Sequence, residues 1–119
     1  MRVGTIQAGN NLTYTRPTSV GNGFTLTEAI KDGTTDALYV NGALVLSQGG
    51  KLATLAGCQS TGNVGRGFNN DTYFAGDIAE VLVYSRALTV AERRSLEDYL
   101  NSKYALTAPA SPLIVSQAK

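Results

Sequence analysis

The feature that most constrains the fold of this chain is the dipeptide Asn41-Gly42, which separates two short apolar runs. The runs cover residues 37–40 and 43–46 and consist of Ala, Leu, Tyr and Val. An Asn-Gly pair between such runs favours a type I′ turn, because both central residues of that turn have positive φ. The sequence therefore predicts an antiparallel hairpin here, preceded by a second turn at residues 32–35.

Four further segments have strand-like sequences. Residues 1–8 and 12–16 are predicted as short strands, the second because threonine and tyrosine favour extended backbone. Residues 24–30 alternate between two faces, which predicts a longer strand. Residues 77–84 are apolar on both faces except at Glu80. Such a pattern predicts a central strand buried between two layers.

A helix is predicted to follow over residues 89–104. Thr89 is suited to the N-cap, and Glu92 three residues later completes a capping box. Apolar residues then recur at helical spacing. The charged residues of this helix are predicted to lie on its outer face; they are Arg93, Arg94, Glu97 and Asp98.

Length and composition indicate one domain. The chain has 119 residues, of which 43% are hydrophobic and 16% charged, which is enough apolar material for a core. Its thirteen glycines favour a fold with many tight turns. We assign residues 1–106 to the domain and residues 107–119, rich in Pro, Ala and Ser, to a linker or tail.

The charge balance argues against nucleic acid as a partner. Ten basic and nine acidic residues give a net charge of +1, so nucleic acid is not predicted as a partner.

No stretch approaches the roughly 20 apolar residues of a membrane span. Residues 1–8 lack the apolar run of a signal peptide. That predicts either a protein outside the usual export route or an internal piece of a longer exported protein.

The residue types present also argue against enzymatic activity. The chain has no histidine, so Ser-His-Asp and Cys-His arrangements are impossible within it. Asp77 and Glu80 are three residues apart on the predicted strand, which places them on opposite faces. A glycosidase needs two carboxylates across one cleft. We therefore predict no enzymatic activity.

Residues 24–104 resemble the later part of a concanavalin A-like lectin/glucanase domain of the laminin-G-like kind. Three pieces carry the resemblance: KDGTTDALYVNG at residues 31–42, FAGDIAEVLVY at residues 74–84 and SRALTVAER at residues 85–93. Their order and spacing both match the family. The paired-carboxylate motif of the glucanases in this family is absent.

The resemblance implies an all-β fold, an antiparallel jelly-roll β-sandwich with one C-terminal helix. It also implies an extracellular or cell-surface location, in a bacterial setting, and a carbohydrate or surface protein as partner. Such domains are usually longer, so the N-terminal part is short or missing here. A partial sandwich leaves strand edges uncovered. We therefore expect a homo-oligomer or a part of a longer chain.

Candidate ligand-binding residues are aromatic, amide and carboxylate side chains in or beside predicted loops. We expect carbohydrate, if bound, to contact them; they are Tyr39, Phe68, Asn69, Asn70, Tyr73 and Glu80. Glu80 has two interpretations. It either forms an ion pair, with Arg86 or Arg66 as partner, or presents a polar group on a ligand-facing surface.

Three aspartates are candidate calcium ligands, namely Asp32, Asp36 and Asp71. Calcium prefers carboxylate and carbonyl oxygens. Aspartate is equally typical of turns, where its side chain bonds nearby backbone groups. Both interpretations stay open, so calcium is a possible cofactor and no other is predicted.

Two functions are compatible with these features. The first is a non-catalytic recognition or adhesion module that binds carbohydrate or a cell-surface partner. The second is a self-assembling structural subunit of an extracellular filament, surface layer or phage appendage. Glycan binding by a monomer would favour the first, and concentration-dependent assembly would favour the second.

Overall fold

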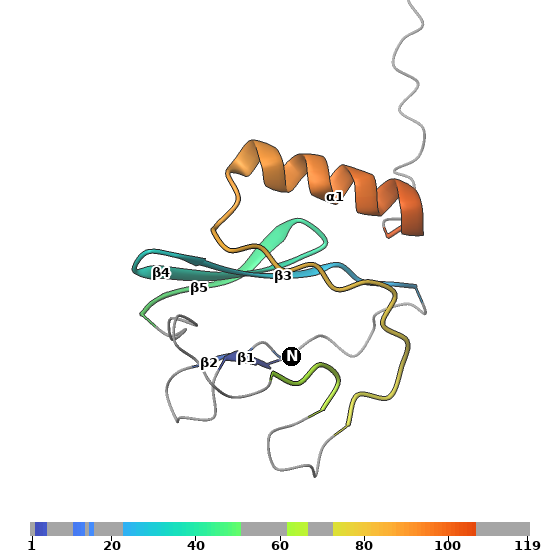
Figure 1. The fold of residues 1–119 in the computed structure, drawn as a ribbon, viewed down its shortest axis with the longest axis horizontal. Helices are drawn as coiled ribbons and strands as arrows, with labels where there is room; N and C mark the ends of the chain where they lie inside the picture. Colours follow the sequence, from blue (N-terminus) through green and yellow to red (C-terminus); the bar gives the residue numbers. More distant parts are fainter. Residues whose placement is uncertain are drawn as a thin grey trace, which may run out of the picture.

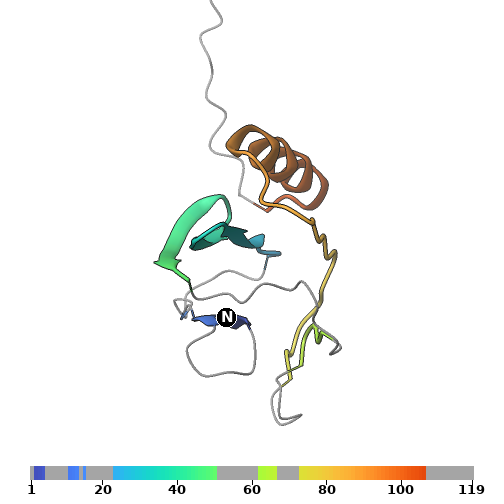
Figure 2. The ribbon, with the colours of Figure 1, turned by 60° about the vertical axis from the view of Figure 1, so that its left-hand side comes forward.

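A computed structural model describes residues 2–4, 11–13, 15, 23–50, 62–66 and 73–106. Their elements form layers (Figure 1). A three-stranded antiparallel sheet lies in the middle, one helix covers one of its faces, and a two-stranded sheet lies on the opposite side. Figure 2 shows the same order of layers from a second direction.

The central sheet contains β3 (Thr27–Asp32), β4 (Thr35–Val40) and β5 (Ala43–Gly49), in that order. The turn between β4 and β5 confirms the predicted hairpin, because Asn41 has φ 49° and Gly42 has φ 76°. The Asn41 side chain also accepts a hydrogen bond from the Leu26 backbone amide at 2.9 Å. This bond fixes the start of β3 against the turn.

The register of the sheet assigns its side chains to two faces. Glu28 lies opposite Tyr39, and Lys31 lies opposite Asp36. Residues directly opposite in an antiparallel pair point to the same face, and neighbours along a strand point to opposite faces. Glu28 and Tyr39 therefore face the helix, whereas Lys31 and Asp36 face the two-stranded sheet.

The two-stranded sheet pairs β1 (Arg2–Gly4) with β2 (Asn11–Thr13). Leu12 of β2 is 1% exposed and Leu38 of β4 is 0% exposed, and these two side chains are the most buried apolar groups of the described residues. Burial of apolar surface here holds the small sheet against the central one. The strand β1 lies within the predicted range 1–8, and β2 overlaps the predicted range 12–16 but begins one residue earlier, at Asn11.

The helix α1 (Val90–Tyr104) begins at the predicted capping box. The Thr89 hydroxyl accepts a bond from the Glu92 amide at 3.3 Å, and the Thr89 amide donates to the Glu92 carboxylate at 2.9 Å. Ala105, in the left-handed region, ends the helix by donating its amide to the Asn101 carbonyl. Leu100 is its buried side chain, 5% exposed.

The prediction of a buried central strand at residues 77–84 is wrong. This segment has no regular secondary structure and forms no strand pair with any described residue. Its side chains are exposed, with Val83 at 84%. The apolar pattern on both faces is typical of a strand, but the segment pairs with none of the described strands.

The predicted fold class is therefore confirmed in part. The antiparallel sheet and the single C-terminal helix are present. A closed jelly-roll sandwich is not, because the described part of the chain forms one three-stranded sheet and one two-stranded sheet.

Candidate functional site

Residues 77–84, here called the edge segment, form an exposed apolar strip on the β3 side of the molecule. In the sheet order β3-β4-β5, β4 is the only described strand that pairs with β3, so β3 is an edge strand of the described sheet. The edge segment passes this side of the sheet before the chain turns into α1 (Figures 1 and 2). Its exposed large side chains, each between 43% and 84% accessible, are Ile78, Val81, Leu82, Val83 and Tyr84.

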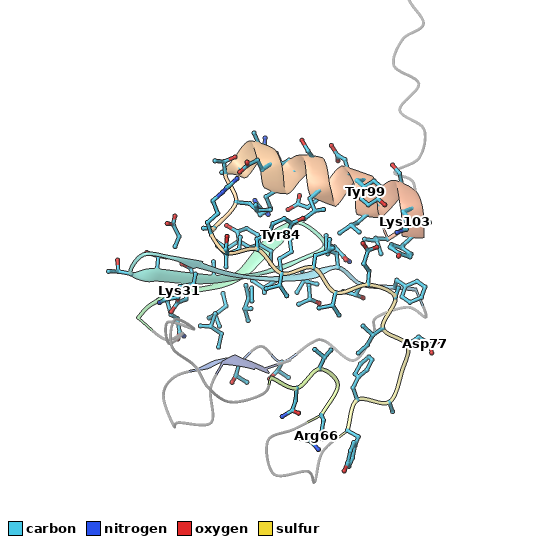
Figure 3. All side chains as sticks on the ribbon, in the orientation of Figure 1. Lys31, Arg66, Asp77, Tyr84, Tyr99 and Lys103 are labelled. Carbon is cyan, nitrogen blue, oxygen red and sulfur yellow. The ribbon has the colours of Figure 1, made fainter. Side chains whose placement is uncertain are left out.

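Glu80 fastens the middle of the edge segment to the end of α1. Its carboxylate accepts hydrogen bonds from Lys103 Nζ at 3.0 Å and from Tyr104 Oη at 2.8 Å. The bond from Lys103, and then that from Tyr104, lower the pKa of Glu80. Figure 3 labels Lys103 at this end of the helix, with Asp77 and Tyr84 marking the two ends of the segment.

The ion-pair interpretation of Glu80 therefore fits, although both predicted partners were wrong. Arg86 instead forms a two-bond pair with Glu92, at 2.7 and 2.8 Å. Arg66 donates to the Asn63 side chain at 2.9 Å. Lys103 is 23 residues from Glu80 in sequence, so strand periodicity gave no sign of this contact.

An aromatic contact reinforces the same junction. The rings of Phe24 and Tyr104 lie 5.8 Å apart at an angle of 60°. Tilted aromatic pairs at this distance are favourable. The Lys103 ammonium also lies 5.1 Å from the centre of the Tyr104 ring. The C-terminal end of α1 is thus held both to the chain before β3 and to the edge segment.

Arg93 fastens the first half of α1 to the sheet. Its guanidinium carbon lies 3.9 Å from the centre of the Tyr39 ring, a close cation–π contact. Its Nη1 also forms an ion pair with Glu97 and lies 3.7 Å from Glu28 Oε2. The side chains of Arg93, Glu28 and Glu97 are 12%, 14% and 19% exposed. We call these three residues the clamp.

The clamp holds two carboxylates and one guanidinium. Burial, followed by repulsion from and hydrogen bonding to Glu97, raises the pKa of Glu28 to about 7 despite the opposing effect of Arg93. The Oε1 atom of Glu28 is buried and accepts no hydrogen bond from any described residue. Burial, followed by the closeness of Glu97, favours the protonated form, whose O–H group could then donate a hydrogen bond.

The prediction that Arg93 and Glu97 lie on the outer face of the helix is wrong. Residues 93, 97, 100 and 104 follow helical spacing and share a face with buried Leu100. The sequence carried a signal for this arrangement. Glu28 interrupts an apolar face of its strand, so a basic partner on the covering helix was to be expected.

Beside the clamp lies a hollow of about 300 Å³ between the sheet and the start of α1. Tyr39 is one of the predicted ligand-binding residues and lines this hollow, but its ring is already covered by Arg93. Tyr73 is 62% exposed, beside Phe74 at 59%, and pairs with Arg66 in an isolated β-bridge. Phe68, Asn69 and Asn70 lie outside the described residues.

The three predicted calcium ligands do not come together among the described residues. Asp36 is fully buried, with Lys31 at 3.5 Å, while Asp32 points to the opposite face and is exposed. Asp71 lies outside the described residues. Nowhere in the described ranges do three acidic or cysteine side chains gather as metal ligands would. The calcium prediction stays untested at Asp71.

Comparison with known proteins points to one family. A family model described as "Concanavalin A-like lectin/glucanases superfamily" matches residues 3–92. A comparison with curated protein sequences finds no match. None of the helices in the described ranges has the length and apolar character needed to cross a bilayer.

Among solved structures, the chain is similar to an S-layer domain-containing protein from Clostridium thermocellum, crystallised as residues 221–444. The TM-score is 0.55 and the sequence identity 22%, over 73% of this chain. At that identity the likeness concerns the fold alone. The match covers 43% of the other chain, so this chain spans less than half of its relative's length.

Proposed function

The chain belongs to the concanavalin A-like lectin/glucanases superfamily, and within that fold we propose that it is a non-catalytic module that binds a protein partner by strand addition at the edge segment. The partner that we propose is a second copy of this chain. The observation that carries the proposal is the exposed, mostly apolar run from Ile78 to Tyr84, which pairs with no strand of the described ranges.

The chemistry of strand addition suits the edge segment. An extended strand that joins a free edge gains affinity from backbone hydrogen bonds, and specificity from alternating side chains. The edge segment offers extended backbone with no strand partner among the described residues. It also offers apolar side chains on both of its faces. Such an unprotected edge favours association with another chain.

The sequence of the edge segment complements itself. In an antiparallel pair of two copies centred on Val81, Ala79 would lie opposite Val83, and Ile78 opposite Tyr84. Apolar side chains would thus meet across the pair. In this register Glu80 would lie opposite Leu82 and not opposite the other Glu80, and its charge is already paired with Lys103. A symmetric contact of this kind uses the same patch on both partners.

The proposed setting is the cell surface. The fold likeness to an S-layer domain-containing protein supports it, as does the membership of a lectin-like superfamily. Enzymatic activity is not proposed. Asp77 and Glu80 supply no facing carboxylate pair, because Glu80 is engaged by Lys103 and Tyr104.

Carbohydrate binding is a second candidate, favoured by one observation. Tyr73 and Phe74 are neighbouring aromatic residues with exposed side chains. Exposed rings give sugar faces a surface on which to stack. Tyr39 does not support this candidate, since Arg93 covers its ring. A glycan array probed with the wild-type chain and with Tyr73→Ala tests the candidate, which requires binding that the substitution removes.

Sedimentation velocity over a micromolar concentration series tests the main proposal. We expect reversible association, and Val81→Lys should weaken it by about tenfold or more, because an inward charge blocks edge pairing. Val90→Lys is the matched control: Val90 is 59% exposed on α1 and Val81 is 54% exposed. A well-folded monomer throughout the series, or equal effects of the two substitutions, would refute the proposal.

A further inference from the structure

We propose that the clamp of Glu28, Arg93 and Glu97 is a pH-sensitive device that holds α1 on the sheet more tightly below neutral pH than above it. The second part of the proposal concerns regulation and rests on the proposed function: through α1, the clamp sets how firmly the edge segment is held for its partner.

The charge count of the clamp is the first argument. Two carboxylates share one guanidinium, and all three side chains are at least four-fifths buried. When both carboxylates are ionised, the buried cluster carries a net charge of −1, which is costly away from water. Glu28 is the weaker partner of Arg93, at 3.7 Å, and its Oε1 accepts no hydrogen bond from any described residue.

Protonation of Glu28 removes both costs at once. The cluster becomes neutral, and the new O–H group can donate a hydrogen bond to the neighbouring Glu97 carboxylate. Burial and the closeness of Glu97 are the same causes that raise the pKa of Glu28 to about 7. Arg93 remains paired with Glu97 in either state. The interaction that changes with pH is therefore the one between β3 and the helix.

The other ionisable groups on the elements around Glu28 are covered, exposed or paired. From β4, Tyr39 faces it, with its ring under Arg93. On β3, Asp32 shares the same face but is exposed. β5 contains no ionisable residue. On the helix and the chain leading to it, the nearest further charges are closed into pairs, namely Arg86 with Glu92 and Lys103 with Glu80.

The direction of the effect follows from linkage. The pKa of Glu28 is higher in the folded protein than the usual 4.5, so the folded state binds this proton more tightly than the unfolded state does. Stability from this group is fully present below about pH 4.5 and is lost as the pH rises through about 7. Loss of the clamp frees the first half of α1, whose far end carries the contacts to Glu80.

The composition of the chain makes the pH dependence caused by Glu28 easier to observe. The chain has no histidine, the side chain that ordinarily titrates between pH 5 and 8. The N-terminal amine and Cys58 can also titrate near the upper end of that range, so the part of the pH dependence that Glu28→Gln removes is the part that reports on Glu28. The matched control is Asp98→Asn, which removes a carboxylate from an exposed position of the same helix.

The first experiment is urea unfolding of the full chain, followed by circular dichroism at pH 5, 6, 7 and 8. For the wild type and Asp98→Asn, the folding equilibrium constant should fall by about tenfold from pH 6 to pH 8. Glu28→Gln should be nearly flat and more stable than the wild type at pH 8. Glu97→Gln should move the wild-type transition to lower pH, because it removes the repulsion on Glu28.

Three outcomes would overturn the clamp: a flat wild-type profile, an unchanged pH dependence in Glu28→Gln, or a Glu28→Gln protein that is weaker at every pH. The last would indicate an ordinary structural ion pair. Sedimentation at pH 6 and pH 8 then tests the link to assembly, which requires association to change with pH in the wild type and not in Glu28→Gln. A chain that never associates but shows the expected unfolding profiles leaves the clamp intact and refutes the proposed function.

Discussion

Two extended segments of this molecule, β4 and the edge segment, have similar compositions and opposite surroundings. In β4, Leu38 is fully buried, and strands pair with it on both sides. In the edge segment, Val83 is 84% exposed, and no described strand pairs with it. The two segments differ in where the strand that pairs with them comes from. A two-residue turn delivers β5 to β4 directly, whereas the edge segment needs a strand that does not follow it in sequence.

This difference explains why one segment forms structure locally and the other presents a surface. Hairpin partners are close in sequence, so little loop entropy is lost when they pair. A strand whose neighbours are distant in sequence, or belong to another chain, gains its pairing only when that neighbour arrives. Among the described regions, the edge segment would therefore gain the most strand pairing and burial from association.

The largest expected effect on stability comes from a substitution in the buried segment, β4. Leu38→Ala should lower the free energy of unfolding by about 2–4 kcal/mol, because it removes a fully buried side chain and leaves a cavity. Val83→Ala, the matched change in the edge segment, should stay within about 0.5 kcal/mol for the monomer. Chemical denaturation in dilute solution measures both. Comparable losses would mean that the edge segment is buried in solution.

The next effect concerns the turn that delivers β5 to β4. Gly42→Ala should cost about 1 kcal/mol or more, since Gly42 has φ 76° and its added Cβ would lie 3.1 Å from Glu97 Oε2. The thermal midpoint measures this loss. Gly23→Ala is the control, because a Cβ there meets nothing within 4 Å. An unchanged midpoint for Gly42→Ala would contradict the type I′ turn.

A structural feature of this molecule was predictable from the sequence when the residues that determine it are close together in the chain. The hairpin at Asn41-Gly42 and the capping box at Thr89 were predictable, because each is decided within a few residues. The clamp and the Glu80–Lys103 contact were not. The contacts from Glu28 to Arg93 and from Glu80 to Lys103 each join residues more than 20 positions apart. Helical periodicity alone placed Arg93 outside, although its spacing to Leu100 carried the opposite signal.

The edge segment shows a different limit. Its apolar character on both faces predicted a buried strand, and that prediction is wrong for the described chain. A sequence pattern reports what a segment can pair with, not whether the partner is present. Tyr73 and Asp71 illustrate the same point for ligands, since loop composition suits turns, sugars and calcium equally.

The smallest expected effect tests how the edge segment is tied to the rest of the molecule. Lys103 is 43% exposed and Glu80 26%, so their ion pair is screened by solvent and contributes less than either change above. We expect Glu80→Gln and Lys103→Met each to lower the thermal midpoint slightly. Their double variant should lose less than the sum, because both remove one contact.

The pH dependence of the Glu80–Lys103 ion pair gives a sharper measurement than the thermal midpoint at one pH. Hydrogen bonds from Lys103 and Tyr104 lower the pKa of Glu80. A carboxylate with a lowered pKa contributes stability above its usual pKa of 4.5, and this contribution is lost as the pH falls through the lowered value. The difference in midpoint between the wild type and Glu80→Gln should therefore be present at pH 6 and shrink on acidification. The clamp at Glu28 is intact in both proteins, so its opposite pH dependence cancels from this difference. A difference that stayed constant or grew on acidification would therefore contradict the stabilising contact at Glu80.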